Sequence, residues 1–471
     1  MKKTKYIPVI LWFIILTGSC EVLDSVENIK PLYRLTEETT FTDAKKTEAV
    51  LNGVYTAWKN SSINIFTAQT MLLSGNYTTT SSIGVDASIN RVDVTSSYLS
   101  SYYRAYYSLL MRANYLIKAL EADFEIPGLN QARRTEMKAE ARLQRAMAHF
   151  FLLRNFGQFY NLNSDLGIVL QEAPLTGTPD NPRSGVLACY NSILLDIDYA
   201  MANAPISARS YGLLTRDAAK AMKAKVLLYM GDWTEAARLA LEIINLPTYE
   251  LETDFKSIYG NGFKSKEVIF SPVSIYPAHI DRPGSSTFSP GPLLISTADK
   301  SVGDPNDGDP VTGEGFDPRF AYAHAQDNVA LMRPNNKYPF GSVTGEQANS
   351  LFILRLGELY LIFAEAKARE AVTGVDSEAL AKLNAIRYRA GLLEISTSSK
   401  AEFLEAIRIE KQLELFGEFN EPWFDMVRYY ILGDLNISDL KSEITSDNQL
   451  ILPFPDAALS GNGGLIQNPG Y

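Results

Sequence analysis

The feature that most constrains the fold of this chain is a pair of adjoining helical patterns between residues 215 and 247. In TRDAAKAMKAKVLLYMGDWTEAARLALEIIN, apolar residues recur every three to four positions, the spacing that places them on one face of a helix. Thr215 is a typical N-cap, and Gly231-Asp232 interrupts the pattern before Trp233 opens a second stretch that ends near Pro247. Because such a short connection joins antiparallel neighbours, the sequence predicts a helical hairpin here.

Small residues lie where the two helices of this hairpin would touch. Ala224 and Ala236 are twelve positions apart, and Leu227 and Ala240 flank them. This arrangement resembles a tetratricopeptide repeat, in which small residues allow paired antiparallel helices to pack closely. Any other helical hairpin would show the same breaks and caps, so that alternative stays open.

Helical spacing continues through most of the chain. A second pair is expected at residues 350–370 and 376–392, with the Gly374 turn between its helices and Asp376 or Ser377 as the second cap. Further helices are expected at 41–60 (capped by Thr42 or Asp43), 101–122, 133–160 (ended by Gly157), 186–205, 401–418 and 422–433. Few strands are expected, and 267–275 and 448–455 are the best short candidates. The sequence therefore predicts a mainly α fold.

Two regions break the helical pattern. Residues 61–97 are rich in Ser, Thr, Asn and Gly, and residues 271–349 hold many of the prolines and glycines without a helical period. A loop-rich insert of this length between packed helices is more often functional than idle. We divide the chain into an N-terminal helical-repeat region (41–260) and a C-terminal region (261–471) that carries the insert 271–349.

The N-terminus has the pattern of a secretory signal over residues 1–19. Three lysines lie among the first five residues, an apolar run extends from Ile7 to Leu16, and small polar residues precede Cys20. The apolar run is far shorter than the roughly 20 residues that span a bilayer. Residues 20–40 are polar and aperiodic, which indicates a tether.

The chain has two cysteines, Cys20 and Cys189. A small-residue run that ends in cysteine resembles a bacterial lipobox, although Leu16 lies one place further upstream than the usual lipobox leucine. On this interpretation Cys20 is acylated, and several acyl chains anchor a protein stably. Cys189 lies in a helical pattern and is expected to be a small buried hydrophobe. A Cys20–Cys189 disulfide is the alternative.

Composition and motifs exclude some classes of function. The formal net charge is -10, and no Lys/Arg cluster stands out, so a nucleic-acid surface is not expected. His149, His279 and His324 are far apart, and neither a G-x-S-x-G element nor a P-loop is present. The turn DPNDGDP (304–310) could hold Ca²⁺ through oxygen ligands, but it lacks EF-hand spacing, and a solvated turn is favoured. We predict no catalytic residues, no metal site and no cofactor.

An ordered series of motifs resembles the SusD/RagB family of outer-membrane nutrient-binding lipoproteins. In the C-terminal half the series comprises LRLGELYLIFAEA (354–366), LNAIRYRAGL (383–392), RIEKQLELFGEFNEPWFDMVRY (408–429) and the tail LPFPDAALSGNGGLIQNPGY (452–471). EAVLNGVYTAW, RANYLI, AEARLQRAMAHFFLLRNFGQ and KAKVLLYMGDWTEA agree in the N-terminal half. One departure is EFNEPWFDMVRY, where Phe419, Asn420 and Glu421-Pro422 replace part of the usual pattern.

The resemblance implies a helical fold with about four tetratricopeptide-like units that support a loop-rich C-terminal part. It also implies a lipid anchor at the outer-membrane surface and pairing with a TonB-dependent (SusC-like) transporter barrel. A protein of this kind captures oligosaccharide, or in some members peptide, and hands it to the barrel. A scaffold protein that uses helical-repeat grooves without a small ligand remains the alternative from another class.

Glycan binding requires flat aromatic faces for sugar C–H groups, and amide, carboxylate or guanidinium partners for hydroxyl groups. The two loop-rich regions contain both kinds of side chain, although each aromatic could instead pack beneath its loop. No tryptophan falls in either region, which fits tyrosine stacking or a peptide ligand. The predicted ligand-binding residues are Tyr77, Arg91, Asp93, Tyr98, Tyr276, Arg319, Tyr322, Arg333, Asn336 and Tyr338. Further candidates are Tyr102, shortly after the first region, and Phe288, Asp317, Phe320 and Asn335 in the second.

Overall fold

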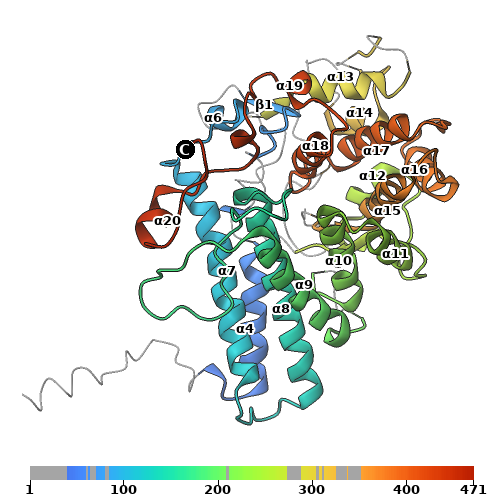
Figure 1. The fold of residues 1–471 in the computed structure, drawn as a ribbon. Coiled ribbons are helices and arrows are strands. Elements are labelled where there is room, and N and C mark those ends of the chain that lie inside the picture. The colour runs from blue at the N-terminus through green and yellow to red at the C-terminus, as the bar shows by residue number, and fades with distance from the viewer. Residues whose placement is uncertain are drawn as a thin grey trace, which may run out of the picture.

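The computed structural model is mainly helical, as the periodicity predicts (Figure 1). It describes residues 40–59, 62–63, 70–79, 84–207, 212–272, 288–303, 307–309, 312–324, 337 and 352–471. Within these ranges, no helix is both long enough and apolar enough to cross a membrane. Cys20 and His279 lie outside the described residues.

The N-terminal region is a stack of long helices. α7 (Ser97–Glu121) and α8 (Gln131–Phe156) pack along each other, α4 (Ala44–Ala57) packs against both, and α9 (Val186–Asn203) covers α8 (Figure 1). The predicted helix ends are confirmed where a capping residue or a glycine marks them in the sequence. Asp43 caps α4 by accepting from the Lys46 N–H, and Gly157 ends α8.

The predicted hairpin is formed by α10 (Arg216–Met230) and α11 (Trp233–Ile244). The Thr215 side chain caps α10, and Gly231 ends it with φ of 82°, a left-handed conformation that glycine adopts without a Cβ clash. Ala224, Ala236 and Ala240 are fully buried, as expected for close helix packing. The small-residue prediction is therefore confirmed.

The C-terminal helices continue the stack from α11. α15 (Leu356–Glu370) packs against α11, α16 (Ser377–Arg389) and α17 (Lys400–Leu415), and α18 (Glu421–Ile431) packs against α17. Asp376 caps α16, as predicted. The other short helices are α6 (Val85–Ser88), α12 (Phe255–Gly260), the 3₁₀ turn η1 (Gly262–Lys264), α19 (Ile437–Leu440) and α20 (Asp456–Gly461).

Two short antiparallel ladders join distant parts of the chain. β1 (Tyr77–Thr79) pairs with β3 (Phe288–Pro290), and β2 (Val268–Phe270) pairs with β4 (Leu354–Arg355). The first ladder matches Tyr77 with Pro290 and Thr79 with Phe288. It therefore connects the two loop-rich regions that the sequence analysis found separately.

Three expectations from the sequence were wrong in detail. The insert 271–349 contains two helices, α13 (Pro292–Lys300) and α14 (Pro318–His324). The helix expected from residue 350 begins only at Leu356, because the residues before it form β4. The stretch 448–455 is no strand: the 3₁₀ turn η3 (Asp447–Leu450) starts it, and the Gln467 side chain bonds both backbone groups of Phe454 in place of a neighbouring strand.

Buried charges hold the C-terminal region together, which the sequence did not indicate. Arg355 binds Glu414 at 2.6 Å and Glu418 at 2.8 Å, and Arg319 binds Glu410 at 2.6 Å. We call this cluster the α17 ion network. Among the described residues it comprises five acidic side chains (Glu267, Asp317, Glu410, Glu414, Glu418) and five basic ones (Arg319, Lys337, Arg355, Arg387, Arg389). This balance matters because an uncompensated buried charge costs several kcal/mol.

Lys337 brings the insert into this network. Its Nζ donates to the carbonyl oxygens of Glu414 and Phe416 at 3.0 and 2.7 Å and to the Glu418 carboxylate at 2.8 Å. The ammonium also lies 4.0 Å from the centre of the Phe416 ring. Lys337 therefore fastens one point of the insert to the end of α17.

The segment that departs from the family pattern has a structural role. Phe419 and Asn420 adopt positive φ values of 39° and 60°, which turns the chain sharply into α18. Glu421 then accepts from Arg154 of α8 at 2.9 Å and from Lys225 of α10 at 2.7 Å. The departure thus joins α18 to the helical stack.

The expectation that Cys189 is a buried hydrophobe is confirmed, and His149 is also an interior residue. Cys189 is free and buried, and burial raises the pKa of its thiol to about 11. The free thiol excludes the Cys20–Cys189 disulfide in this structure. His149 is buried and accepts the Gln171 N–H at its Nε2.

Candidate ligand-binding surface

The predicted ligand residues fall into three groups: surface, interior and outside the described ranges. Tyr276, Arg333, Asn336 and Tyr338 belong to the last group, together with Asn335. Phe288 contributes its backbone to β3, and its side chain is not described. The structure can therefore place Tyr77, Arg91, Asp93, Tyr98, Arg319 and Tyr322.

Two of these residues lie in the interior, which corrects the prediction that they face a ligand. Arg319 is fully buried because Asp317, Glu410 and Glu414 surround its guanidinium within the α17 ion network. Tyr77 is 1% exposed, and its hydroxyl hydrogen-bonds His324 Nε2 at 3.1 Å. Both side chains are occupied by internal partners, so neither offers a face at the surface.

Three other candidates from the insert and α7 are also interior. Tyr102, Asp317 and Phe320 are each at most 3% exposed. The Tyr102 hydroxyl accepts from the Asn155 side-chain amide, and Asp317 holds Arg319 at both carboxylate oxygens. Packing beneath the loops, the alternative raised for the aromatics, describes Tyr102 and Phe320.

Arg91, Asp93 and Tyr98 lie on the surface, in the segment between α6 and the start of α7. All three are exposed, and Tyr98 exposes 38% of its surface. Asp93 accepts the N–H and hydroxyl of Thr95, both at 2.8 Å, and the backbone hydrogen bond leads in lowering its pKa. This local turn fixes a carboxylate beside an exposed aromatic ring.

Tyr322 is placed elsewhere. It lies half-buried on α14 against Phe255 of α12, with ring centres 6.3 Å apart, and Lys256 Nζ lies 6.0 Å from its ring. α14 and α12 pack beside α17, whereas α6 lies toward the start of α7 (Figure 1). The structure therefore leaves Tyr98, Arg91 and Asp93 exposed along one segment of the chain and places Tyr322 on another part of the fold.

The sequence predicts only some of the residues that surround Tyr98. A shallow depression beside Tyr98 is lined by Thr70, Leu73, Gly84, Asp86, Ala87, Val92, Ser96 and Leu452. Tyr471, the last residue, is 39% exposed near the same segment. In the sequence the tail carries a family signature, and nothing local in QNPGY indicates that Tyr471 is partly exposed.

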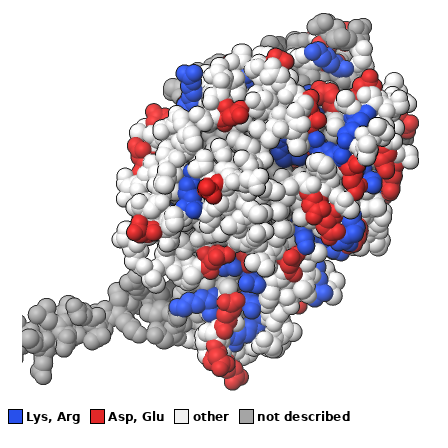
Figure 2. Space-filling view, viewed as in Figure 1, with Lys and Arg blue, Asp and Glu red and all other residues white. Residues whose placement is uncertain are grey.

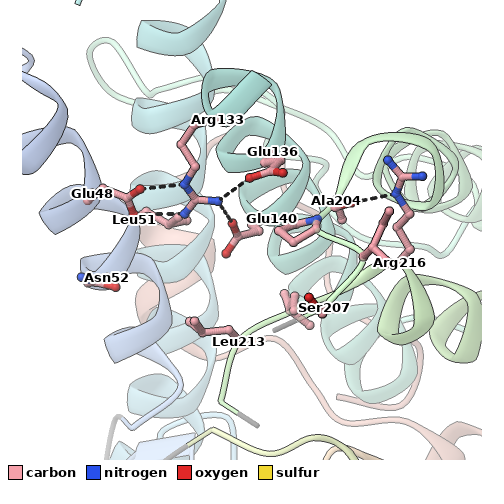
Figure 3. Close-up of a pocket in the computed structure, with 13 residues that line it drawn as sticks. Glu48, Leu51, Asn52, Arg133, Glu136, Glu140, Ala204, Ser207, Leu213 and Arg216 are labelled. Atoms are coloured by element: carbon pink, nitrogen blue, oxygen red, sulfur yellow. Dashed lines mark hydrogen bonds and ion pairs between the residues drawn. The ribbon is translucent and has the colours of Figure 1, made fainter. Parts of the chain in front are cut away.

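A larger recess lies between α4, α8 and the segments that flank α10, and Tyr98 does not line it (Figure 3). Its volume is about 540 Å³. Arg133 crosses it and binds Glu48 at 2.6 Å, Glu140 at 2.7 Å and Glu136 at 3.1 Å. Its donors are thus engaged by carboxylates of the recess itself. Residues 208–211, next along the chain, lie outside the described ranges.

The surface carries no large patch of one charge in the view of Figure 2. Lys/Arg and Asp/Glu side chains alternate over the half that holds α10, α11 and α15 to α17, and the half over α7 and α20 is largely uncharged. Among the described residues, no group of three or more His, Cys, Asp or Glu side chains could hold a metal ion.

These features define a helical-repeat scaffold, and comparisons identify its family. The SusD family profile matches residues 306–471, and a SusD-like profile described as "Starch-binding associating with outer membrane" matches residues 23–228. The chain belongs to the SusD/RagB family.

Individual relatives are distant but similar along their whole length. "SusD-like protein P2" of Formosa agariphila is 24% identical, and the alignment covers 100% of both chains. The crystal structure of a SusD-like protein from Bacteroides fragilis aligns with a TM-score of 0.73 at 20% identity, over 94% of this chain and 100% of that one. A laminarin-binding SusD-like protein aligns with a TM-score of 0.67 at 23% identity, over 91% and 100%. The structural likenesses establish the fold.

Proposed function

We propose that this protein is a non-enzymatic, lipid-anchored outer-membrane protein that captures oligosaccharides and delivers them to a TonB-dependent transporter barrel. The surface around Tyr98, Arg91 and Asp93 carries the ligand contacts of this proposal. One observation supports it most: β1 pairs with β3, so the two loop-rich regions chosen for their aromatic and polar side chains meet at one end of the stack. Membership in a family with a laminarin-binding structural neighbour supports a glycan ligand.

The chemistry of the surface suits shallow capture. An exposed tyrosine ring packs on the C–H face of a sugar, and a guanidinium and a carboxylate pair with its hydroxyl groups. The depression beside Tyr98 is too small to enclose a ligand, at about 20 Å³. A long chain that lies across a surface fits such a site better than a small enclosed molecule.

Calorimetry and affinity electrophoresis against a polysaccharide panel that includes laminarin test the ligand class. We expect saturable binding to at least one glycan and no hydrolysis of any. Tyr98→Ala is expected to weaken that binding by about 1–3 kcal/mol, the range for truncating an aromatic anchor. Tyr338→Ala is expected to do the same. Tight binding of peptides without any glycan binding would replace glycan with peptide as the ligand.

The anchor is tested separately at Cys20. Cys20→Ala is expected to release the protein from the membrane fraction and to abolish labelling with a palmitate analogue, because no acyl chain would remain. Cys189→Ala is the matched control and is expected to stay membrane-bound, since its thiol is buried in the fold. Unchanged membrane retention and labelling in Cys20→Ala would contradict the lipid anchor.

A further inference from the structure

The C-terminal tail is fixed in place beside the proposed ligand surface. The Asn468 side chain donates to the carbonyl oxygens of Phe156, at the end of α8, and Leu452, at 2.8 and 2.7 Å. The Gln467 side chain bonds both backbone groups of Phe454. These bonds set where the last residue lies, and Figure 1 shows the C-terminus beside α6.

Tyr471 ends this tail as a partly exposed residue whose hydroxyl is turned inward. The hydroxyl donates to the Ile451 carbonyl oxygen at 3.2 Å, and 39% of the residue is exposed. Gly470 adopts a φ of 92° in the turn before it and lies against the Asn448 side chain, so a larger residue would clash there. Burial raises the pKa of Tyr471 to about 12, so the phenol is neutral at physiological pH.

Tyr471 and Tyr98 line two neighbouring depressions of the fold. Tyr98 lines one shallow depression and Tyr471 lines another, and both depressions share Leu73, Val92 and Leu452 as wall residues. Neither depression encloses more than about 20 Å³. The three shared wall residues are buried, so both tyrosines lie at the edge of the same packed part of the fold.

We infer that Tyr471 is a second aromatic ligand contact, which together with Tyr98 receives two sugar rings of one glycan chain. This inference rests on the proposed function, because it names a further contact of the same surface. Arg91 and Asp93 lie exposed beside Tyr98 and supply hydroxyl partners between or beside the stacked sugars. The ligand class is an oligosaccharide long enough to reach both rings.

Substitutions at Tyr471 separate its ring from its hydroxyl group. We measure affinity by calorimetry for the panel glycan that the wild type binds. Tyr471→Ala and Tyr98→Ala are each expected to lower the affinity about tenfold or more, because each removes one stacking face. Tyr471→Phe is expected to bind within about twofold of the wild type, since the hydroxyl faces Ile451 rather than the ligand.

Tyr388→Ala is the matched control, because Tyr388 is 78% exposed on α16, away from α6 (Figure 1). It is expected to leave the affinity unchanged. Tyr471→Leu keeps apolar bulk at the end of the tail if Tyr471→Ala fails to fold. Weakened binding by Tyr471→Leu, with a melting temperature near that of the wild type, supports the inference.

Two results would overturn the inference in different ways. Wild-type affinity in folded Tyr471→Ala or Tyr471→Leu, with weakened binding in Tyr98→Ala, would remove Tyr471 from the ligand surface and leave the proposed function standing. Absence of glycan binding by the wild type would overturn both proposals together. A loss of affinity in Tyr388→Ala as large as in Tyr471→Ala would contradict a localised two-tyrosine contact.

Discussion

Two helices of this protein carry similar residues but place them in opposite environments. α11 has Glu235, Arg238 and Glu242 on its surface, where they pair with one another, and it buries alanine, leucine and isoleucine. α17 buries Glu410 and Glu414 completely. Both helices show charged residues at helical spacing in the sequence. Those of α11 are exposed, whereas Glu410 and Glu414 of α17 are buried.

The difference between these helices shows that an ion pair's contribution depends on its environment. A pair on the surface gains little, because water screens it and both side chains lose conformational freedom. A buried pair costs desolvation, and removing one partner leaves the other charge without compensation. The α17 ion network should therefore tolerate change far less than the α11 surface.

The largest expected effect comes from neutralising Glu414. Burial alone would raise its pKa, but attraction to Arg389, Arg355 and Arg319 outweighs burial and holds the pKa below its ordinary value. Glu414→Gln leaves these guanidinium groups with too few carboxylates, and we expect unfolding free energy to fall by about 3–5 kcal/mol. Urea denaturation at pH 7 measures this loss.

The control for Glu414 lies on the same helix. The Glu405 side chain is 49% exposed and pairs with Arg408 one turn later. Glu405→Gln is expected to cost at most about 1 kcal/mol, because the Glu405 end of the pair is solvated and the buried Arg408 guanidinium keeps its hydrogen bond to Gln412. Equal losses in the two variants would contradict the contrast between buried and exposed pairs.

The dependence of stability on pH tests buried groups in both regions of the chain. His149 lies on α8 in the N-terminal region, and His324 lies on α14 in the C-terminal region. Burial, followed by the nearby charges of Arg145 and Lys337 respectively, lowers the pKa of His149 and of His324 to about 3. The unfolded chain titrates near pH 6.5 and binds more protons than the folded chain below that value, so stability is lost as pH falls from 6.5 toward 3. At pH 4.5 each histidine should cost about 2.7 kcal/mol.

Substitution isolates each histidine from the carboxylates that titrate in the same experiment. His149→Gln and His324→Gln are each expected to flatten the dependence of unfolding free energy on pH between 6.5 and 4.5, relative to the wild type. Both regions should respond alike, because both imidazoles are fully buried. A slope identical to that of the wild type in either variant would show that its imidazole does not resist protonation.

The apolar face of α11 gives an effect of intermediate size. Ala240 is fully buried where α11 packs on its neighbours, so Ala240→Leu should overpack the contact and cost about 1–3 kcal/mol. The melting temperature measures the change. Arg238→Leu adds a leucine two positions away on the exposed face and should change stability by less than about 1 kcal/mol. A neutral Ala240→Leu would refute close packing at the small residues.

The smallest expected effect is at the α11 surface pairs. The Arg238 side chain is 52% exposed and pairs with Glu235 and Glu242. Arg238→Ala should lower the unfolding free energy by roughly 0.3–1 kcal/mol, and 0.5 M salt should reduce the difference from the wild type, because salt screens exposed charges. A decrease in unfolding free energy above about 2 kcal/mol that does not depend on salt would contradict the difference between the exposed Arg238 pairs and the buried Glu414 pairs.

The ends of many helices could be predicted because their signals are local. Thr215, Gly231 and Asp376 act on backbone groups within a few residues of themselves, so the sequence alone contains both partners. Local patterns also predicted which alanines would be buried. The stretch 448–455 could not be predicted as irregular, because its backbone partner is the distant side chain of Gln467.

The candidate ligand surface was only partly predictable for the same reason. Loop composition selected Arg91, Asp93 and Tyr98, and the structure leaves all three exposed. It also selected Arg319, which distant carboxylates on α17 draw into the interior. The partial exposure of Tyr471 could not be predicted, because it depends on how the tail packs against segments hundreds of residues earlier in the sequence.

The sequence by itself determined the helical class, the caps and turns, and the ordered series of motifs that resembles the SusD/RagB family. Each of these features depends on residues that are close together in the chain. Only the tertiary structure decided which charges are buried and which tyrosines stay at the surface. The physical reason is that the environment of a charged or aromatic side chain depends on partners brought together by folding. Arg355 and Glu414 form a 2.6 Å ion pair, although 59 positions separate them in the chain.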